Sequence, residues 1–138
     1  MRNVRQISDK FPDNEKITIN LGYVDLGRID LLVQEGFYSN RSDFIRTAIR
    51  NQLDTQGDAV TKTIERHTME LGLRDYSRAE LEALKAKGEM LHVKVVGLAR
   101  FDADVTPDLA RDTIASITVL GAVQASPDIK KALADRMR

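Results

Sequence analysis

The sequence lacks cysteine and tryptophan, and its only aromatic residues are four phenylalanines and three tyrosines. The absence of cysteine excludes disulfides and thiolate metal sites, which fits a reducing cytoplasm. No apolar run approaches the roughly 18 residues that a membrane-spanning helix needs, and the polar first fifteen residues do not resemble a signal peptide. We therefore expect a cytoplasmic protein with no membrane partner.

A basic excess is also absent. The chain has 21 Lys and Arg against 21 Asp and Glu, and the two signs balance within residues 1–56, 57–88 and 89–138 taken separately. Proteins that bind nucleic acids usually carry a basic excess, because they must neutralise phosphates. Any role of that kind must depend on a small, locally placed group of side chains.

No pattern of catalytic or metal-binding residues is present. His67 and His92 are the only histidines, and a zinc or nickel site needs several nitrogen or sulfur ligands within one sphere. Gly97 and Gly121 do not belong to a glycine-rich phosphate loop. We expect no catalytic site, no metal and no cofactor, and hence a protein that is not an enzyme.

In residues 15–21, EKITINL, polar and apolar side chains alternate strictly from Lys16 to Leu21. This period of two is typical of a β-strand, with one face apolar and the other polar. No second strand lies in the same segment, so both edges of this strand would stay unpaired. A second copy of the chain can supply the missing strand, and we therefore expect a homodimer.

Two helices are predicted after this strand, over residues 24–35 and 40–54, because apolar residues recur there at helical spacing. Gly36 suits the end of the first helix, and Asn40 with Asp43 suits the capped start of the second. One copy of this segment has too few apolar residues to fold alone. The predicted core of the dimer consists of Ile17, Ile19, Leu21, Phe44, Ile45, Ala48 and Ile49.

The strand ITINL, its spacing to the second helix, and the phrase NRSDFIRTAIR at residues 40–50 resemble the ribbon-helix-helix superfamily. The similarity is to CopG-type repressors and to the DNA-binding half of nickel-responsive repressors. It covers residues 14–54. The chain departs from the nickel repressors, because it has only two histidines and no cysteine with which to bind a metal, so metal sensing is not carried over.

This resemblance implies a specific use of double-stranded DNA. Two strands pair antiparallel across the dimer, and the ribbon enters the major groove, where its outward side chains contact base edges. The start of the second helix holds a phosphate with its free N–H groups. The implied base contacts are Lys16, Thr18 and Asn20, and the implied phosphate contacts are Ser39, Asn40, Arg41 and Ser42.

The remaining chain is predicted to hold a helical connector at residues 57–88 and a repeat at residues 89–138. The connector contains one helix over residues 58–73 and a second that is capped at Ser77 and ends at Gly88. In the repeat, MxxVxVVG at residues 90–97 matches IxxIxVLG at residues 114–121, an offset of 24. The pattern is weakly similar to the strand, turn and helix of a leucine-rich-repeat-like solenoid.

Two such rungs leave stacking faces uncovered, so we expect rungs of two or more chains to stack as an oligomerisation domain. A compact sensing unit is the alternative. The residues predicted for this surface are Val93, Val95, Ile117 and Val119.

The sequence as a whole indicates an α+β chain with a flexible arm at residues 1–14, a DNA-binding domain at residues 15–56, the connector, and the repeat domain. We expect a nucleoid-associated transcriptional repressor. Two other functions stay open: an antitoxin of a toxin–antitoxin pair, and a DNA-coating or partition protein that polymerises through residues 89–138.

Overall fold

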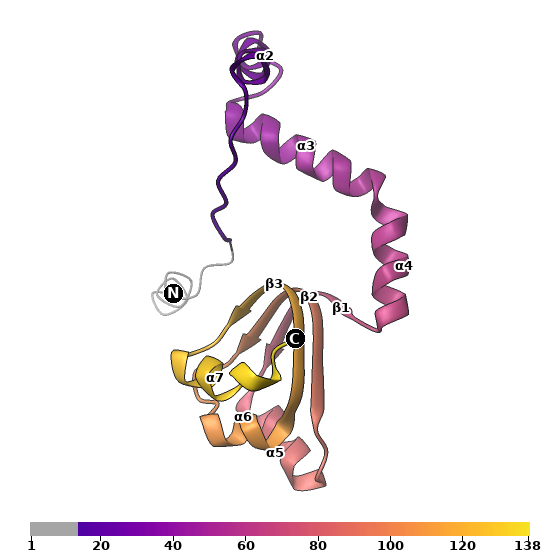
Figure 1. The fold of residues 1–138 in the computed structure, drawn as a ribbon, viewed down its shortest axis with the longest axis vertical. Helices are drawn as coiled ribbons and strands as arrows, with labels where there is room; N and C mark the ends of the chain where they lie inside the picture. The colour runs from indigo at the N-terminus through magenta and orange to yellow at the C-terminus, as the bar shows by residue number, and fades with distance from the viewer. Residues whose placement is uncertain (1–13) are drawn as a thin grey trace. The chain divides into compact units, whose positions relative to one another are not determined.

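The computed structural model describes residues 14–138, so the predicted arm lies almost entirely outside the described residues. The chain divides into two compact units, unit 1 (Met1–Val60) and unit 2 (Thr61–Arg138). The described residues combine helices with three parallel strands, in keeping with a mixed helix and strand class (Figure 1).

The described part of unit 1 contains two helices, α2 (Tyr23–Gln34) and α3 (Arg41–Thr55), and the first residues of α4 (Gly57–His67). Both helix predictions agree with the structure to within one residue at each end. Residues 14–22 form neither helix nor strand in the single chain. A strand is stabilised by ladder hydrogen bonds to a neighbour, and the single chain gives this segment no such neighbour.

The ends of α2 and α3 are well formed. Gly36 adopts a φ of +86°, and the N–H of Phe37 donates to the carbonyl of Leu32 at 3.0 Å, which closes the end of α2. At α3 the side chain of Asn40 accepts a hydrogen bond from the N–H of Asp43 at 2.8 Å. The predicted Asn40 cap is therefore confirmed.

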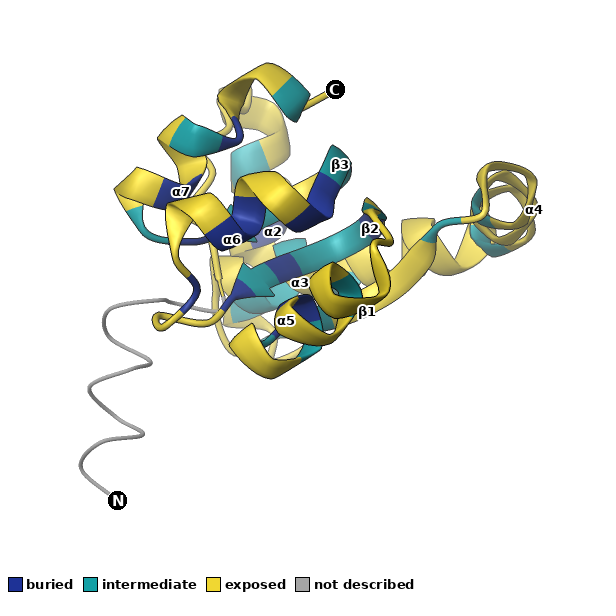
Figure 2. Cartoon of the chain, turned by 90° about the horizontal axis from the view of Figure 1, so that it is seen from below, coloured by how far each residue is buried: buried dark blue, intermediate teal, exposed yellow. Residues whose placement is uncertain are grey.

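Unit 1 has almost no core of its own. Among residues 14–60 only Ile29 is buried, and most of the segment is exposed (Figure 2). Phe44 and Ile45 are half-buried, and Phe44 meets the ring of Tyr38 edge to face with centroids 5.0 Å apart. Ala48 and Ile49 are exposed. The predicted apolar stripe of α3 is thus only partly covered in the single chain, because α2 and the turn after it pack on its first residues alone.

The prediction for residues 58–73 is wrong in its second half. Helix α4 ends at His67, Thr68 takes a left-handed φ of +55°, and the chain then enters strand β1 (Glu70–Tyr76). Residues 57–88 are therefore not an all-helical connector, because β1 joins the sheet of unit 2. The second predicted helix is confirmed as α5 (Arg78–Lys87), with Gly88 in the left-handed region at its end.

Unit 2 is built from three strand–helix pairs. Strand β2 (Leu91–Phe101) lies between β1 and β3 (Ile114–Gln124), all three parallel, and helices α6 (Pro107–Thr113) and α7 (Pro127–Ala132) follow β2 and β3 (Figure 1). A short 3-10 helix, η1 (Ala134–Arg136), comes last. The register places Val93 beside Ile117 and Gly97 beside Gly121. Residues aligned by the offset of 24 are therefore neighbours in the sheet.

Each of the three helices begins in the same way. The hydroxyls of Ser77, Thr106 and Ser126 accept a hydrogen bond from the N–H three residues later, at 3.1, 3.2 and 3.3 Å. Pro107 and Pro127 occupy the first helical position of α6 and α7, where proline removes no hydrogen bond. The cap predicted at Ser77 is therefore confirmed.

The core of unit 2 lies between the sheet and helices α5, α6 and α7. Its buried side chains include Tyr76, Leu81, Phe101 and Leu133, and Tyr76 stacks on Phe101 with centroids 5.1 Å apart. Four residues that we predicted to form an oligomerisation surface are in this core or against it: Val93, Val95 and Ile117 are buried, and Val119 is half-buried. They face the helices of their own chain and cannot form an outer surface.

A row of glycines crosses the sheet. Gly72, Gly97 and Gly121 lie side by side in the register, with φ of +120°, +136° and +121°. A Cβ atom added to Gly97 would overlap the carbonyl oxygen of Gly72, and one added to Gly121 would overlap that of Gly97. At Gly72 an added Cβ meets nothing within 4 Å, because β1 is the edge strand of the described sheet.

Candidate nucleic-acid interface

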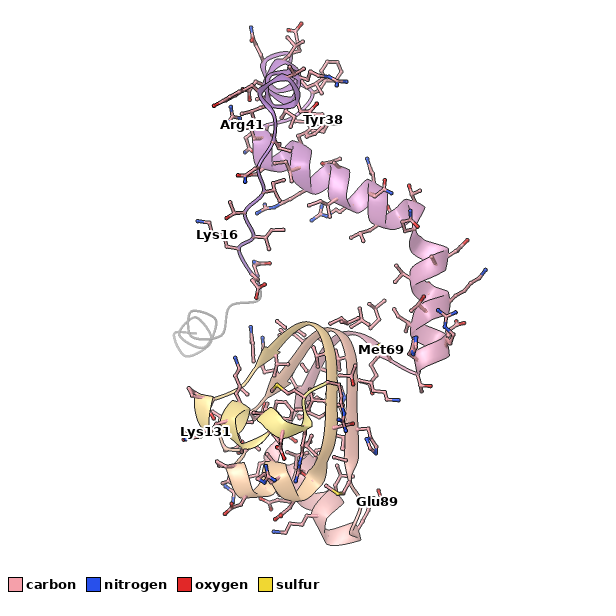
Figure 3. The ribbon with its side chains drawn as sticks, in the orientation of Figure 1. Lys16, Tyr38, Arg41, Met69, Glu89 and Lys131 are labelled. Carbon is pink, nitrogen blue, oxygen red and sulfur yellow. The ribbon has the colours of Figure 1, made fainter. Side chains whose placement is uncertain are left out.

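The segment before α2 presents both of its predicted faces to solvent. Lys16, Thr18 and Asn20 are exposed, and Figure 3 labels Lys16 on this segment. Ile17, Ile19 and Leu21 retain 71%, 56% and 41% of their surface exposure. Exposing these three aliphatic side chains to water costs free energy, about 25 cal/mol for each Å² of apolar surface left uncovered. This segment is incomplete as a single chain.

Some of the polar groups at the start of α3 are already hydrogen-bonded to one another. The carboxylate of Asp43 accepts a hydrogen bond from the N–H of Ser39 at 2.9 Å, while the Asn40 side chain holds the N–H of Asp43. Within the described residues, the N–H groups of Asn40, Arg41 and Ser42 have no acceptor in the chain. Three of the four predicted phosphate contacts, Asn40, Arg41 and Ser42, thus keep free backbone donors.

The side chain of Arg41 lies against α2 (Figure 3). Its Nε and Nη2 donate to the two carboxylate oxygens of Asp30, both at 2.8 Å. This bidentate geometry fixes the plane of the guanidinium. The Nη1 group remains available for an anion, so Asp30 orients Arg41 and also offsets part of its positive charge.

The ion pair has a defined pH dependence. The hydrogen bond from Arg41 lowers the pKa of Asp30, and the same bond raises the pKa of Arg41. Because the pKa of Asp30 is lowered in the folded chain, its stabilising contribution is present above the unfolded value of about 3.9. That contribution is lost as the pH falls through the lowered folded value.

The described part of the chain contains no group of three or more His, Cys, Asp or Glu residues that could hold a metal ion. None of the described helices combines the length and the apolar surface that a membrane span needs. The Nδ1 of His92 lies 2.8 Å from the hydroxyl of Ser116 on the neighbouring strand.

Two features of the chain were missed from the sequence. Asp30 was not predicted to pair with Arg41, since eleven residues and a turn separate them. The third strand–helix pair was also missed. Its signal was present, because Leu71-Gly72-Leu73 repeats Val96-Gly97-Leu98 at an offset of 25.

Comparison with known proteins adds one finding. A protein-family model described as the Ribbon-Helix-Helix transcriptional regulator family matches residues 12–130. The match extends through β1, β2 and β3, so it includes the strand–helix pairs of unit 2 as well as the segment before α2. No curated protein and no solved structure matches the chain.

Proposed function

This chain belongs to the Ribbon-Helix-Helix transcriptional regulator family, and on that premise we propose that it is a dimeric repressor that reads operator DNA. Residues 15–21 of two chains pair antiparallel to form the ribbon. The ribbon enters the major groove, which is wide enough for two strands. The exposure of Ile17, Ile19 and Leu21 in the single chain is the observation that supports this proposal most directly.

Dimer formation assigns a role to each face of the segment. Ile17, Ile19 and Leu21 turn inward onto the uncovered apolar side chains of α3. Lys16, Thr18 and Asn20 turn outward to the base edges, where asparagine can bind adenine with two hydrogen bonds and lysine can donate to guanine. Six outward side chains from two chains then select the sequence.

Phosphate binding positions the ribbon in this proposal. The free N–H groups of Arg41 and Ser42 point from the start of α3, where the helix dipole favours an anion. The Nη1 of Arg41 adds a charged donor, held in place by Asp30. The net charge of the chain is zero, so we expect it to contact few phosphates. Few counterions are then released on binding, and the affinity for DNA should depend only weakly on salt concentration.

Asn20→Ala tests the base-reading role. We expect the preference for the operator over random DNA to fall by about 1–3 kcal/mol per site, because one bidentate base contact is lost. Fluorescence anisotropy with both DNA duplexes measures this difference. Asn51→Ala on the exposed surface of α3 is the matched control and should change neither affinity. Equal losses on both duplexes for Asn20→Ala would assign Asn20 to the backbone instead.

Arg41→Ala and Asp30→Asn test the phosphate site in opposite directions. Arg41→Ala should weaken binding to operator and random DNA alike, and should lower the salt slope by about one unit. Asp30→Asn removes a negative charge beside the site and should strengthen binding to both duplexes. Arg66→Ala on α4 is the control. A loss confined to the operator would contradict the phosphate assignment.

Footprinting of the protein on the DNA upstream of its own gene tests the repressor itself. A repressor protects one short site at every protein concentration at which it binds. Protection that spreads outward as the concentration rises would instead identify a coating protein. We also propose that unit 2 joins chains together, through a surface other than its buried core.

A further inference from the structure

Within unit 2, one face of the sheet is not covered by α5, α6 or α7. Helices α5, α6 and α7 pack on the other face, where alternate residues of β2 such as Val93, Val95 and Ala99 are buried. Because side chains alternate along a strand, the residues between them point to the opposite face. In the register these residues form rows that run across all three strands.

Two adjacent rows on that face are entirely apolar. One joins Leu71, Val96 and Leu120, and the next joins Leu73, Leu98 and Ala122. Leu71, Leu73 and Leu120 are 71%, 54% and 63% exposed, and the other three side chains are half-buried. We call these six residues the leucine patch.

The leucine patch has sharp polar borders. On one side the next rows hold Lys94 beside Thr118 and His92 beside Ser116. On the other side Arg100 donates to the side chain of Gln124 at 3.1 Å and lies 3.8 Å from the carboxylate of Asp75. Parallel sheets are normally covered on both faces, and an apolar patch rimmed by polar side chains marks a binding surface.

We propose that the leucine patch packs against the same patch of a second chain within the ribbon dimer. The inference rests on the proposed dimeric function and adds the surface through which unit 2 takes part. A patch that meets its own copy forms a closed two-fold contact, and two sheets pack face to face about 10 Å apart. The two-fold symmetry of a ribbon dimer allows this contact without further chains.

The size and charge of the patch favour a second copy as its occupant. Six side chains fall short of the roughly 20–30 residues on each side of a standard interface, so the patch is too small to hold an untethered partner tightly. A ribbon dimer brings two copies together at an effective concentration in the millimolar range. The six residues carry no charge, so no like charges meet when the patch faces itself.

The absence of native cysteine provides a direct test in the full-length chain. Lys94→Cys places a single spin label on the exposed border of the patch without changing its six residues. Double electron–electron resonance between the two labels of a dimer should give one narrow distance distribution. Leu71→Glu with Leu120→Glu should broaden it, because four buried carboxylates would oppose the contact.

Ala83→Glu with Ala86→Glu is the matched control, because it adds the same charge at exposed positions of α5. We expect the narrow distance to survive in that variant, and light scattering to show a dimer for every variant. Two results would overturn the patch contact alone. One is a broad distance distribution in the dimeric Lys94→Cys chain with an intact patch. The other is a narrow distribution that persists in Leu71→Glu with Leu120→Glu. A monomeric chain would overturn both this contact and the ribbon dimer.

Discussion

Gly97→Ala is expected to unfold unit 2 under conditions in which the original chain is folded. The added Cβ overlaps the backbone carbonyl of Gly72, which no side-chain rotation can relieve. In addition, alanine must adopt a φ of +136°. Together these effects should lower the free energy of unfolding by at least about 3 kcal/mol. Chemical denaturation followed by circular dichroism measures the loss.

Gly72→Ala separates the steric overlap from the strain of the backbone angle. Gly72 has nearly the same positive φ, but an added Cβ there meets open space. The loss should be limited to backbone strain, about 1–3 kcal/mol. Gly121→Ala should resemble Gly97→Ala, since its Cβ overlaps the carbonyl of Gly97. Equal losses at Gly72 and Gly97 would show that the close glycine row contributes nothing beyond the backbone angle.

Ile19→Lys has the second large expected effect. In the proposed dimer Ile19 lies in the middle of the apolar face of the ribbon, where a lysine would bury an unpaired charge. Among residues 14–60 of the single chain, Ile29 alone is buried, so loss of the partner removes most of the core of unit 1. We expect a monomer in light scattering and a loss of helical signal that corresponds to α2 and α3.

Thr18→Lys is the control for this prediction. It adds the same side chain one residue away, on the outward face of the same segment, and should leave the dimer intact. Unit 2 keeps its own core in both variants. A folded, dimeric Ile19→Lys chain would show that residues 15–21 do not form the contact between chains.

The sequence predicted the local features that depend on a few neighbouring residues. The predicted caps at Asn40 and Ser77 both form, because a short polar side chain at the start of a helix satisfies an otherwise free N–H. The offset of 24 also predicted which residues of β2 and β3 are neighbours. A cap and its partner lie three residues apart, and the repeat has a regular offset, so both features can be recognised from the spacing of residues in the sequence.

Strand β1 has a weaker signal, the offset of 25 at Leu71-Gly72-Leu73. Its core-facing positions include Glu70, Gly72 and Arg74, so its core face lacks the aliphatic residues of β2 and β3. Arg74 instead pairs with Glu80 at 2.6 Å and lies over the ring of Tyr76. The edge position of β1 permits these polar side chains, and edge position is a property of the folded sheet.

The surfaces of unit 2 were predicted incorrectly for a related reason. The prediction assigned Val93, Val95 and Ile117 to an oligomerisation surface, because two repeats alone leave stacking faces uncovered. The three helices cover these residues within the chain, while the intervening leucines are left exposed. The sequence shows that a strand has two faces, but it does not show which face the helices cover.

Selection of binding sites from a randomised pool of duplex DNA tests the central claim most directly. If two copies of residues 15–21 read the major groove, the full-length chain should enrich a two-fold symmetric site. Asn20→Ala should relax that site at the same step in each half, because each chain loses one base contact. Enrichment of no common sequence, or of a site that Asn20→Ala leaves unchanged, would contradict a DNA-reading ribbon.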